Sequence, residues 1–280
     1  MNRRQLLLGL GSAIVAAACG SSPHEPSPTP QPPPQPQPPP PGPPRLGITR
    51  ILAFGDSMTA GTTSAPLPGV HGLDAGLPQS YVFKLQTLLT QRYSAQSVLV
   101  FNEGRAGNRA ADDQRRLIDA IRASNPEALL LLEGANDLNM VGNRDAISPT
   151  IGALEVLIGE GVSRGIRVFI GTLPPQRVGG KSAAAGFIGD FNEQIRKMAP
   201  DEGATLVDFF RSLTINDIGE DGLHPTEAGY QRMAEIWLDA LKAAYEQPPS
   251  SLLADRMHQP YPRNLPLPFS APRCHPPDSM

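Results

Sequence analysis

Residues 51–59 read Ile-Leu-Ala-Phe-Gly-Asp-Ser-Met-Thr, so an unbroken apolar run ends in a glycine that polar residues follow. A short run without polar alternation is typical of a strand that is buried on both faces. Similar runs recur along the chain, and stretches with the apolar spacing of a helix lie between them. The predicted strands are residues 51–54, 98–101, 128–132, 168–170 and 205–207, and the predicted helices are residues 80–93, 110–123, 148–163, 188–198 and 226–245. This alternation predicts an α/β fold with a five-stranded parallel sheet that helices cover on both faces.

The 32 prolines of this 280-residue chain are concentrated near its two ends, in residues 23–44 and 248–277. Proline lacks a backbone N–H and fixes φ, so these stretches favour an extended spacer over a helix or a sheet. The region between them has an ordinary globular composition. We therefore predict a signal segment at residues 1–19, a proline-rich linker at 20–47, a folded domain at 48–246 and a proline-rich, disordered tail at 247–280.

The first 19 residues have the pattern of an export signal. Arg3 and Arg4 precede an apolar run at residues 6–18, which is too short for a permanent membrane span but suits a secretory signal. Ala16-Ala17-Ala18-Cys19 resembles a bacterial lipobox, in which the cysteine carries lipid, and cleavage after Ala18 without lipidation is the alternative. We expect an exported, periplasmic or cell-surface lipoprotein whose membrane contact is a lipid anchor at Cys19.

Composition excludes several classes of protein. The net charge is −3, which argues against the basic surface of a nucleic-acid binder. Cys19 and Cys274 both lie outside residues 48–246, so the predicted domain has neither a disulfide framework nor a cysteine-rich zinc site. We expect no metal and no cofactor.

Residues with the functional groups of acyl transfer follow the predicted strands. Ser57 follows the first strand, Gly107 the second and Asn136 the third, and Asp221 and His224 follow the fifth. Because the carboxyl ends of parallel strands meet at one edge of the sheet, we expect these residues to lie close together.

Each of these residues has a role in an attack on an acyl carbonyl. A serine hydroxyl becomes a nucleophile when a neighbouring base takes its proton, and histidine is suited to that task. A carboxylate such as Asp221 can hold the other nitrogen of His224, which lies three residues further along the chain. The amides of Ser57 and Gly107 and the side-chain amide of Asn136 can donate to an oxyanion.

Four segments resemble, in order, the sequence blocks of the SGNH (GDSL-like) hydrolase superfamily. They are Gly-Asp-Ser-Met-Thr at 55–59, residues 102–108, Gly-Ala-Asn-Asp at 134–137 and Asp-Gly-Leu-His-Pro at 221–225. The resemblance spans the predicted domain. It implies a flavodoxin-like three-layer α/β/α sandwich with strand order 2-1-3-4-5.

The same resemblance implies a serine esterase that works through an acyl-enzyme on carboxylic esters or thioesters. It implies Ser57 as nucleophile, His224 as base and Asp221 as the acid that orients it, with Ser57, Gly107 and Asn136 as the oxyanion donors. Gly104 is the alternative to Gly107 in the second block. We favour Gly107, because a short polar residue follows it, as is common in the family.

Two other functions are compatible with parts of the sequence. The hydroxyl-rich residues 57–64 after the first strand suit a flavodoxin-like phosphate or flavin binder, but that function gives Asp221, His224 and Asn136 no role. A tethered binding protein without catalysis is the second alternative, and covalent labelling of Ser57 would distinguish it from an esterase.

The fold does not select the substrate, which could be a small-molecule, glycan or lipid ester. We expect residues 64–79, which carry few large apolar side chains, to form a loop beside the nucleophile that shapes the acyl pocket. We therefore expect short-chain acyl or acetyl esters. Asp56 is expected to support the loop through backbone hydrogen bonds, and Glu103 and Arg105 are expected to be exposed loop charges.

Overall fold

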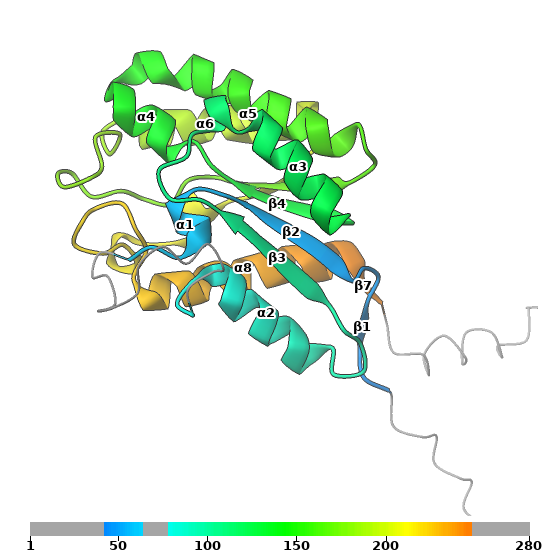
Figure 1. Cartoon of the computed structure of the whole chain (residues 1–280). Helices are drawn as coiled ribbons and strands as arrows, with labels where there is room; N and C mark the ends of the chain where they lie inside the picture. The colour runs from blue at the N-terminus through cyan, green and yellow to red at the C-terminus, as the bar shows by residue number, and fades with distance from the viewer. Residues whose placement is uncertain (1–41, 64–77, 248–280) are drawn as a thin grey trace, which may run out of the picture. The chain divides into compact units, whose positions relative to one another are not determined.

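The computed structural model describes residues 42–63 and 78–247 (Figure 1). Contacts divide the chain into two units, Met1–Pro39 and Pro40–Met280, and the described residues all belong to the second. Several predicted segments lie outside the described residues. They are the signal segment, most of the linker, residues 64–77 of the predicted acyl-pocket loop and nearly all of the tail. Within the described part of the chain, no helix is long and apolar enough to cross a membrane.

The centre of the domain is a parallel sheet of five strands, which confirms the predicted α/β fold. The strand order is β3-β2-β4-β5-β6, which is the order 2-1-3-4-5 when the five are numbered along the chain. The bounds are β2 Arg50–Gly55, β3 Leu99–Gly104, β4 Ala128–Leu132, β5 Arg167–Gly171 and β6 Thr205–Val207. Gly55 pairs with Gly104 on one side and with Leu132 on the other, so three neighbouring strands end level with one another.

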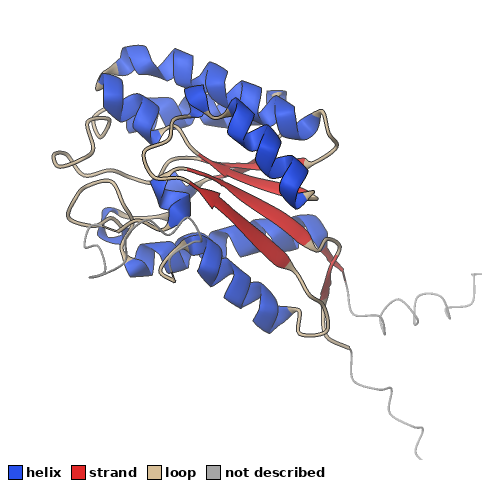
Figure 2. Ribbon diagram, in the orientation of Figure 1, coloured by secondary structure: helices blue, strands red, loops and turns tan. Residues whose placement is uncertain are grey.

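Helices cover both faces of the sheet (Figures 1 and 2). α3 (Gln114–Ser124), α5 (Ile147–Val162) and α6 (Ile188–Asp201) lie on one face, and α2 (Tyr81–Arg92) and α8 (Glu227–Tyr245) lie on the other. Because both faces are covered, all five residues of β4 are fully buried, as are Ile51 to Phe54 of β2. On the second face, Trp237 of α8 is fully buried. Its ring packs edge-to-face against the ring of Phe209, with 5.0 Å between the ring centroids.

Five short helices among the described residues were not predicted, and several of them follow strands directly. They are α1 Ser57–Ala60, α4 Ala135–Val141, η2 Arg144–Ala146, α7 Phe209–Ser212 and η3 Ile215–Asp217. Side-chain caps hold some of them, as when Asp208 accepts a hydrogen bond from the amide of Arg211 in α7. The short helix η1 (Ala110–Asp112) is the first turn of the predicted helix 110–123. The predicted helix 110–123 is divided at Asp113, whose side chain is buried and used in other contacts.

The domain extends slightly beyond both predicted boundaries. β1 (Arg45–Leu46) pairs antiparallel with β7 (Glu246–Gln247), so the linker prediction of 20–47 and the tail prediction of 247–280 were wrong at these edges. Leu46 is only 3% exposed, and Gln96 accepts from its amide and donates to its carbonyl. Two-residue strands are too short to leave a periodic pattern in the sequence.

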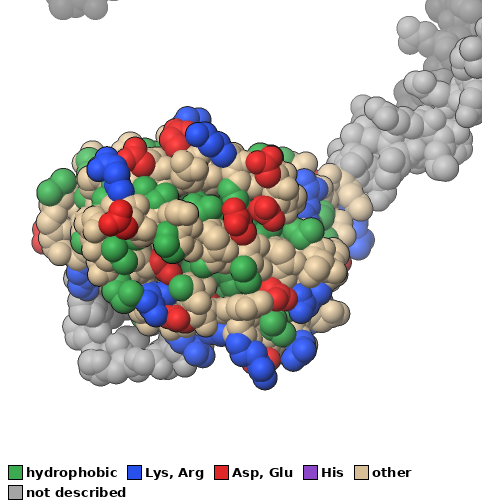
Figure 3. Space-filling model, turned by 90° about the horizontal axis from the view of Figure 1, so that it is seen from above, with side chains coloured by type: hydrophobic (Ala, Val, Ile, Leu, Met, Phe, Trp, Pro, Cys, Tyr) green, Lys and Arg blue, Asp and Glu red, His purple; other side chains and the backbone are tan. Residues whose placement is uncertain are grey.

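Basic and acidic side chains are interspersed on the face of the molecule that Figure 3 shows. That distribution agrees with the sequence, in which acidic and basic residues are nearly balanced.

Candidate active site

Ser57 lies at the turn between β2 and the short helix α1. Asp56 caps that helix and accepts a hydrogen bond from the amide of Met58 at 2.9 Å, as predicted. Gly55 is required at the strand end, because a Cβ there would collide with the carbonyl of Leu132 and the hydroxyl of Thr59. The turn therefore fixes Ser57 at the carboxyl edge of the sheet.

The loop that follows the last strand brings His224 to Ser57. Nε2 of His224 lies 2.8 Å from Oγ of Ser57, and its Nδ1 lies 2.6 Å from Oδ2 of Asp221. The other oxygen of Asp221 accepts from the amides of Leu223 and His224, so the same carboxylate also shapes the loop. Gly222 allows this tight turn through its φ of +80°. The structure therefore brings together the three residues predicted to catalyse.

The electrostatics of the loop suit a charged aspartate. Burial raises the pKa of Asp221, but the hydrogen bonds from His224 and Leu223 outweigh that effect and lower the pKa well below its usual value. An ionised carboxylate that contacts Nδ1 of a histidine favours the tautomer in which Nδ1 carries the proton. Nε2 is then free to accept the proton of Ser57.

The two backbone amides predicted as oxyanion donors are available. Within the described residues, neither the amide of Ser57 nor that of Gly107 has a hydrogen-bond partner. Gly107 is exposed, with φ at +84°. Gly104, the alternative, donates its amide to Oδ1 of Asn102 at 2.8 Å and packs against the backbone of Thr59 and Ala60. These contacts favour Gly107 over Gly104.

Asn136 has a second role that the sequence did not indicate. Its Nδ2 donates to the carbonyl of Asn108 at 2.7 Å, so one of its two amide hydrogens is used within the protein. The next residue, Asp137, accepts from the amides of Ala110 and Ala111 at 2.9 and 3.1 Å. Both side chains therefore hold the segment that contains Gly107.

Residues 53–232 match the GDSL-like Lipase/Acylhydrolase family. The chain belongs to this family. Its folded domain is accordingly an ester-bond hydrolase of the GDSL-like type.

Similar proteins are found among curated sequences and among solved structures. A multidomain esterase from Ruminococcus flavefaciens is 28% identical over 128 residues, which are 44% of this chain and only 16% of that protein's length. The lipase/acylhydrolase from Enterococcus faecalis superposes with a TM-score of 0.58 at 21% identity, covering 71% of this chain and 97% of that chain.

Two further solved structures of similar fold are named as esterases of carbohydrates. An acetyl-xylooligosaccharide esterase from Geobacillus stearothermophilus, solved as a mutant, has a TM-score of 0.56 at 20% identity over 70% of this chain and 95% of that one. The Clostridium thermocellum family 3 carbohydrate esterase has a TM-score of 0.50 at 23% identity over 70% and 98%. At these identities the likeness concerns the fold.

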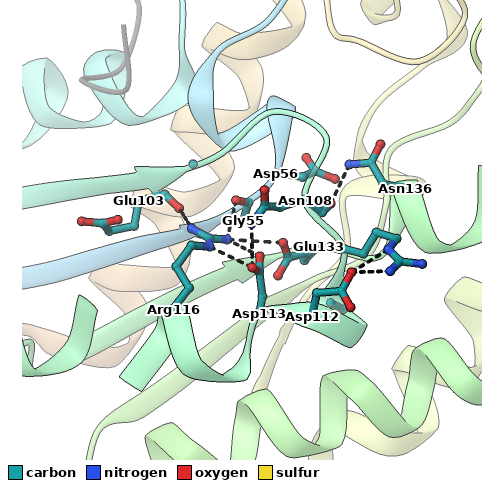
Figure 4. A network of polar contacts seen from close by, with 12 residues as sticks. Gly55, Asp56, Glu103, Asn108, Asp112, Asp113, Arg116, Glu133 and Asn136 are labelled. Carbon is teal, nitrogen blue, oxygen red and sulfur yellow. Dashed lines mark hydrogen bonds and ion pairs between the residues drawn. The ribbon is translucent and has the colours of Figure 1, made fainter. Parts of the chain in front are cut away.

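Behind the GDSL-like turn lies a group of buried charges that the sequence analysis missed (Figure 4). Its members are Asp56, Asp113, Arg116 and Glu133, and we call them the buried charge cluster. Burial raises the pKa of Asp56 to about 7, and burial with the neighbouring Asp113 carboxylate raises the pKa of Glu133 well above its usual value. A charged residue directly after the fully apolar strand at 128–132 was the available signal, because such a side chain cannot easily reach water.

Of the two charges predicted to be exposed in a loop, one is exposed and the other is not. Glu103 was expected to be an exposed loop charge, but it is half-buried in β3 and its carbonyl accepts from Arg116, since strand pairing continues to Gly104. Arg105 is exposed in the turn, as expected.

The structure gives little support to a phosphate cradle after β2. In this GDSL-like domain, residues 57–60 form α1 instead of an open loop. The hydroxyl of Thr59 is buried and lies 3.0 Å from the hydroxyl of Tyr81. Among the described residues, no group of His, Cys, Asp and Glu could hold a metal ion.

Proposed function

We propose that this chain is an exported serine esterase that hydrolyses carboxylic esters or thioesters through Ser57, His224 and Asp221. The observation that carries the proposal is the continuous pair of contacts from Ser57 Oγ to His224 Nε2 at 2.8 Å and from His224 Nδ1 to Asp221 Oδ2 at 2.6 Å. This constellation is the arrangement by which a serine is activated for acyl transfer.

In the first half of the reaction, Ser57 Oγ attacks the acyl carbonyl while His224 Nε2 takes the hydroxyl proton. The carbonyl oxygen becomes an oxyanion, toward which the amides of Ser57 and Gly107 and the remaining N–H of Asn136 donate. Asp221 keeps the imidazole oriented and stabilises its positive charge. His224 then passes the proton to the departing alcohol or thiol, which leaves an acyl-Ser57 ester.

In the second half, a water molecule attacks the acyl group and His224 takes one of its protons. The same donors stabilise the second oxyanion. When that intermediate collapses, the carboxylic acid leaves and Ser57 regains its proton from His224. The cycle needs no cofactor, because every proton that moves is held by Ser57, His224, water or the leaving group.

We take short-chain acyl esters, including acetylated glycans, as the proposed substrates. The few large apolar residues in 64–79 favour a short acyl group. Two proteins of similar fold are named as a carbohydrate esterase and an acetyl-xylooligosaccharide esterase, which makes acetylated xylo-oligosaccharides a first choice for assay.

The proposal is tested with the full chain and its Ser57→Ala variant. We would assay p-nitrophenyl esters of graded chain length beside acetylated xylo-oligosaccharides. We expect turnover by the wild-type protein, fastest with acetyl or other short esters, and only residual turnover by the variant. Equal activity in both proteins would refute the serine mechanism, whereas a preference for long chains would refute only the substrate class.

The proposed location depends on the first 19 residues. Cys19→Ala should release the protein from membranes while its turnover of p-nitrophenyl acetate stays the same. A wild-type mature protein that is found free in the medium without lipid would refute the anchor and leave the esterase proposal intact.

A further inference from the structure

One side chain from α3 reaches the ends of three strands of the sheet. The guanidinium of Arg116 donates to the carbonyl of Gly55 at the end of β2 and to the carbonyl of Glu103 in β3. It also lies 3.5 Å from Oε1 of Glu133, the first residue after β4. The three strands lead to Ser57, Gly107 and Asn136, respectively. Figure 4 shows Arg116 together with Gly55, Glu103 and Glu133 at the ends of these strands.

The charge of Arg116 is held in place by its surroundings. Its side chain is 11% exposed and lies over the ring of Phe54 at 3.7 Å from the ring centroid. It forms an ion pair with Asp113, whose side chain is only 2% exposed. Removing one partner of a buried ion pair is strongly destabilising, because the other charge is left uncompensated. The pair is therefore fixed in position.

A chain of hydrogen bonds connects this pair to the predicted oxyanion donors. Oδ1 of Asp113 accepts from Nε of Arg116 at 3.0 Å and from Nδ2 of Asn108 at 2.6 Å. The carbonyl of the same Asn108 accepts from Nδ2 of Asn136 at 2.7 Å. Asn108 directly follows Gly107, so the chain of contacts that begins at Arg116 passes beside one predicted donor, Gly107, and ends at another, Asn136.

We propose that Arg116, acting through Asp113 and Asn108, is a positioning residue that sets the spacing between the nucleophile turn and the oxyanion donors. Arginine suits this role, because its planar fork can donate to several acceptors at once, whereas lysine carries a single ammonium group. Arg116 touches neither substrate nor reacting atoms. The inference rests on the proposed function, because spacing matters only if Ser57 and the donors act on one acyl group.

The test uses the full chain with two variants and one matched control. Arg116→Lys keeps the positive charge beside Asp113 but cannot reach Gly55 and Glu103 together. Asn108→Ala keeps the buried ion pair and removes the link from Asp113 to the oxyanion segment. Arg115→Gln is the control, because Arg115 is on the same helix with a side chain that is 83% exposed and pairs with Asp119 at the surface.

Three quantities are measured for each protein: kcat and KM with p-nitrophenyl acetate, the affinity for a trifluoromethyl ketone that mimics the tetrahedral intermediate, and the melting temperature. A misplacement of about 1 Å outside the reacting atoms can cost roughly 10²-fold in rate, so we expect kcat to fall at least about tenfold in both variants. We expect KM to change little and the ketone affinity to fall by the same factor as kcat/KM. The control should match the wild-type protein.

A merely structural role predicts a different pattern, in which the melting temperature falls while the ketone affinity of the folded protein stays at the wild-type value. That pattern, or a wild-type kcat in either variant, would overturn the inference. If Arg116→Lys does not fold, Asn108→Ala decides by the same criteria. A wild-type protein without esterase activity would refute the proposed function as well, whereas active wild-type and variant proteins would refute the positioning role alone.

Discussion

Oγ of Ser57 and Nε2 of His224 lie 2.8 Å apart although 167 positions separate the two residues in the chain. Two local devices set this distance. The cap at Asp56 fixes the turn that carries Ser57, and the two amide contacts of Asp221 fix the loop that carries His224. Both sets of contacts are local in the chain. The sheet therefore aligns the Ser57 turn with the His224 loop, and few other side chains are needed to set the distance.

Turnover should not change between pH 5 and 9 through protonation of Asp221. Asp221 keeps its charge over this range, because its hydrogen bonds hold its pKa well below the usual value. Activity needs the neutral imidazole of His224, because its Nε2 must take the proton of Ser57. Asp221→Asn should reduce kcat by up to about 10⁴-fold, because the imidazole loses its acceptor at Nδ1. An Asp221→Asn protein with wild-type kcat in steady-state kinetics would contradict the orienting role of Asp221.

Asn136→Ala should reduce kcat by roughly 10²- to 10³-fold, or about 2.7–4 kcal/mol of transition-state stabilisation. The variant loses the proposed oxyanion donor and also the hydrogen bond that holds the Asn108 carbonyl. Steady-state kinetics with p-nitrophenyl acetate measures the effect. Asn143→Ala is the matched control, because Asn143 is exposed and caps only the short helix η2. An Asn136→Ala protein with unchanged kcat would remove the oxyanion assignment.

The stability of the protein should depend on the buried carboxyl group of Asp56. Burial raises its pKa from 3.8 to about 7, so the folded state holds this proton more tightly than the unfolded chain does. The free energy of unfolding therefore decreases as pH rises from about 4 to about 7, by an amount on the order of 4 kcal/mol. Asp56→Asn keeps the helix cap and removes the ionisation.

Urea unfolding at pH 5 and pH 8 measures this effect. We expect Asp56→Asn to be more stable than the wild-type protein at pH 8, and this advantage should be much smaller at pH 5. Some decrease with pH should persist in the variant, because Glu133 also has a raised pKa. Asp119→Asn serves as control, since the Asp119 side chain is 54% exposed. Equal pH dependence in the wild-type and Asp56→Asn proteins would contradict the buried ionisation.

Leu46→Ala should destabilise the fold by about 2–5 kcal/mol, although Leu46 lies in a stretch that reads as linker. Its side chain is 3% exposed and belongs to the hydrophobic core. Denaturant unfolding of the full chain tests the prediction, with Leu99→Ala as control, because Leu99 is 46% exposed. If both substitutions cost the same small amount, β1 contributes nothing to the domain.

The five central strands could be predicted because each contains a short run of apolar residues, as at 128–132. The grouping of Ser57, His224 and Asp221 could be predicted because chemically suited residues follow those runs, and the structure brings the three side chains together. The choice of Gly107 over Gly104 needed the structure, since it depends on the bond from Gly104 to Asn102. Arg116 also needed it, because a charge on a helix is normally solvated, and only the packing of α3 against the strand ends buries it.

The most direct test of the central claim is covalent labelling of the full chain with a fluorophosphonate, followed by peptide mass mapping. A serine reacts rapidly with such reagents only when a neighbouring base activates it. We predict one adduct, on Ser57, and at most a trace of it in the His224→Ala protein. No adduct on the wild-type protein, an adduct on a different serine, or full labelling of His224→Ala would contradict the account.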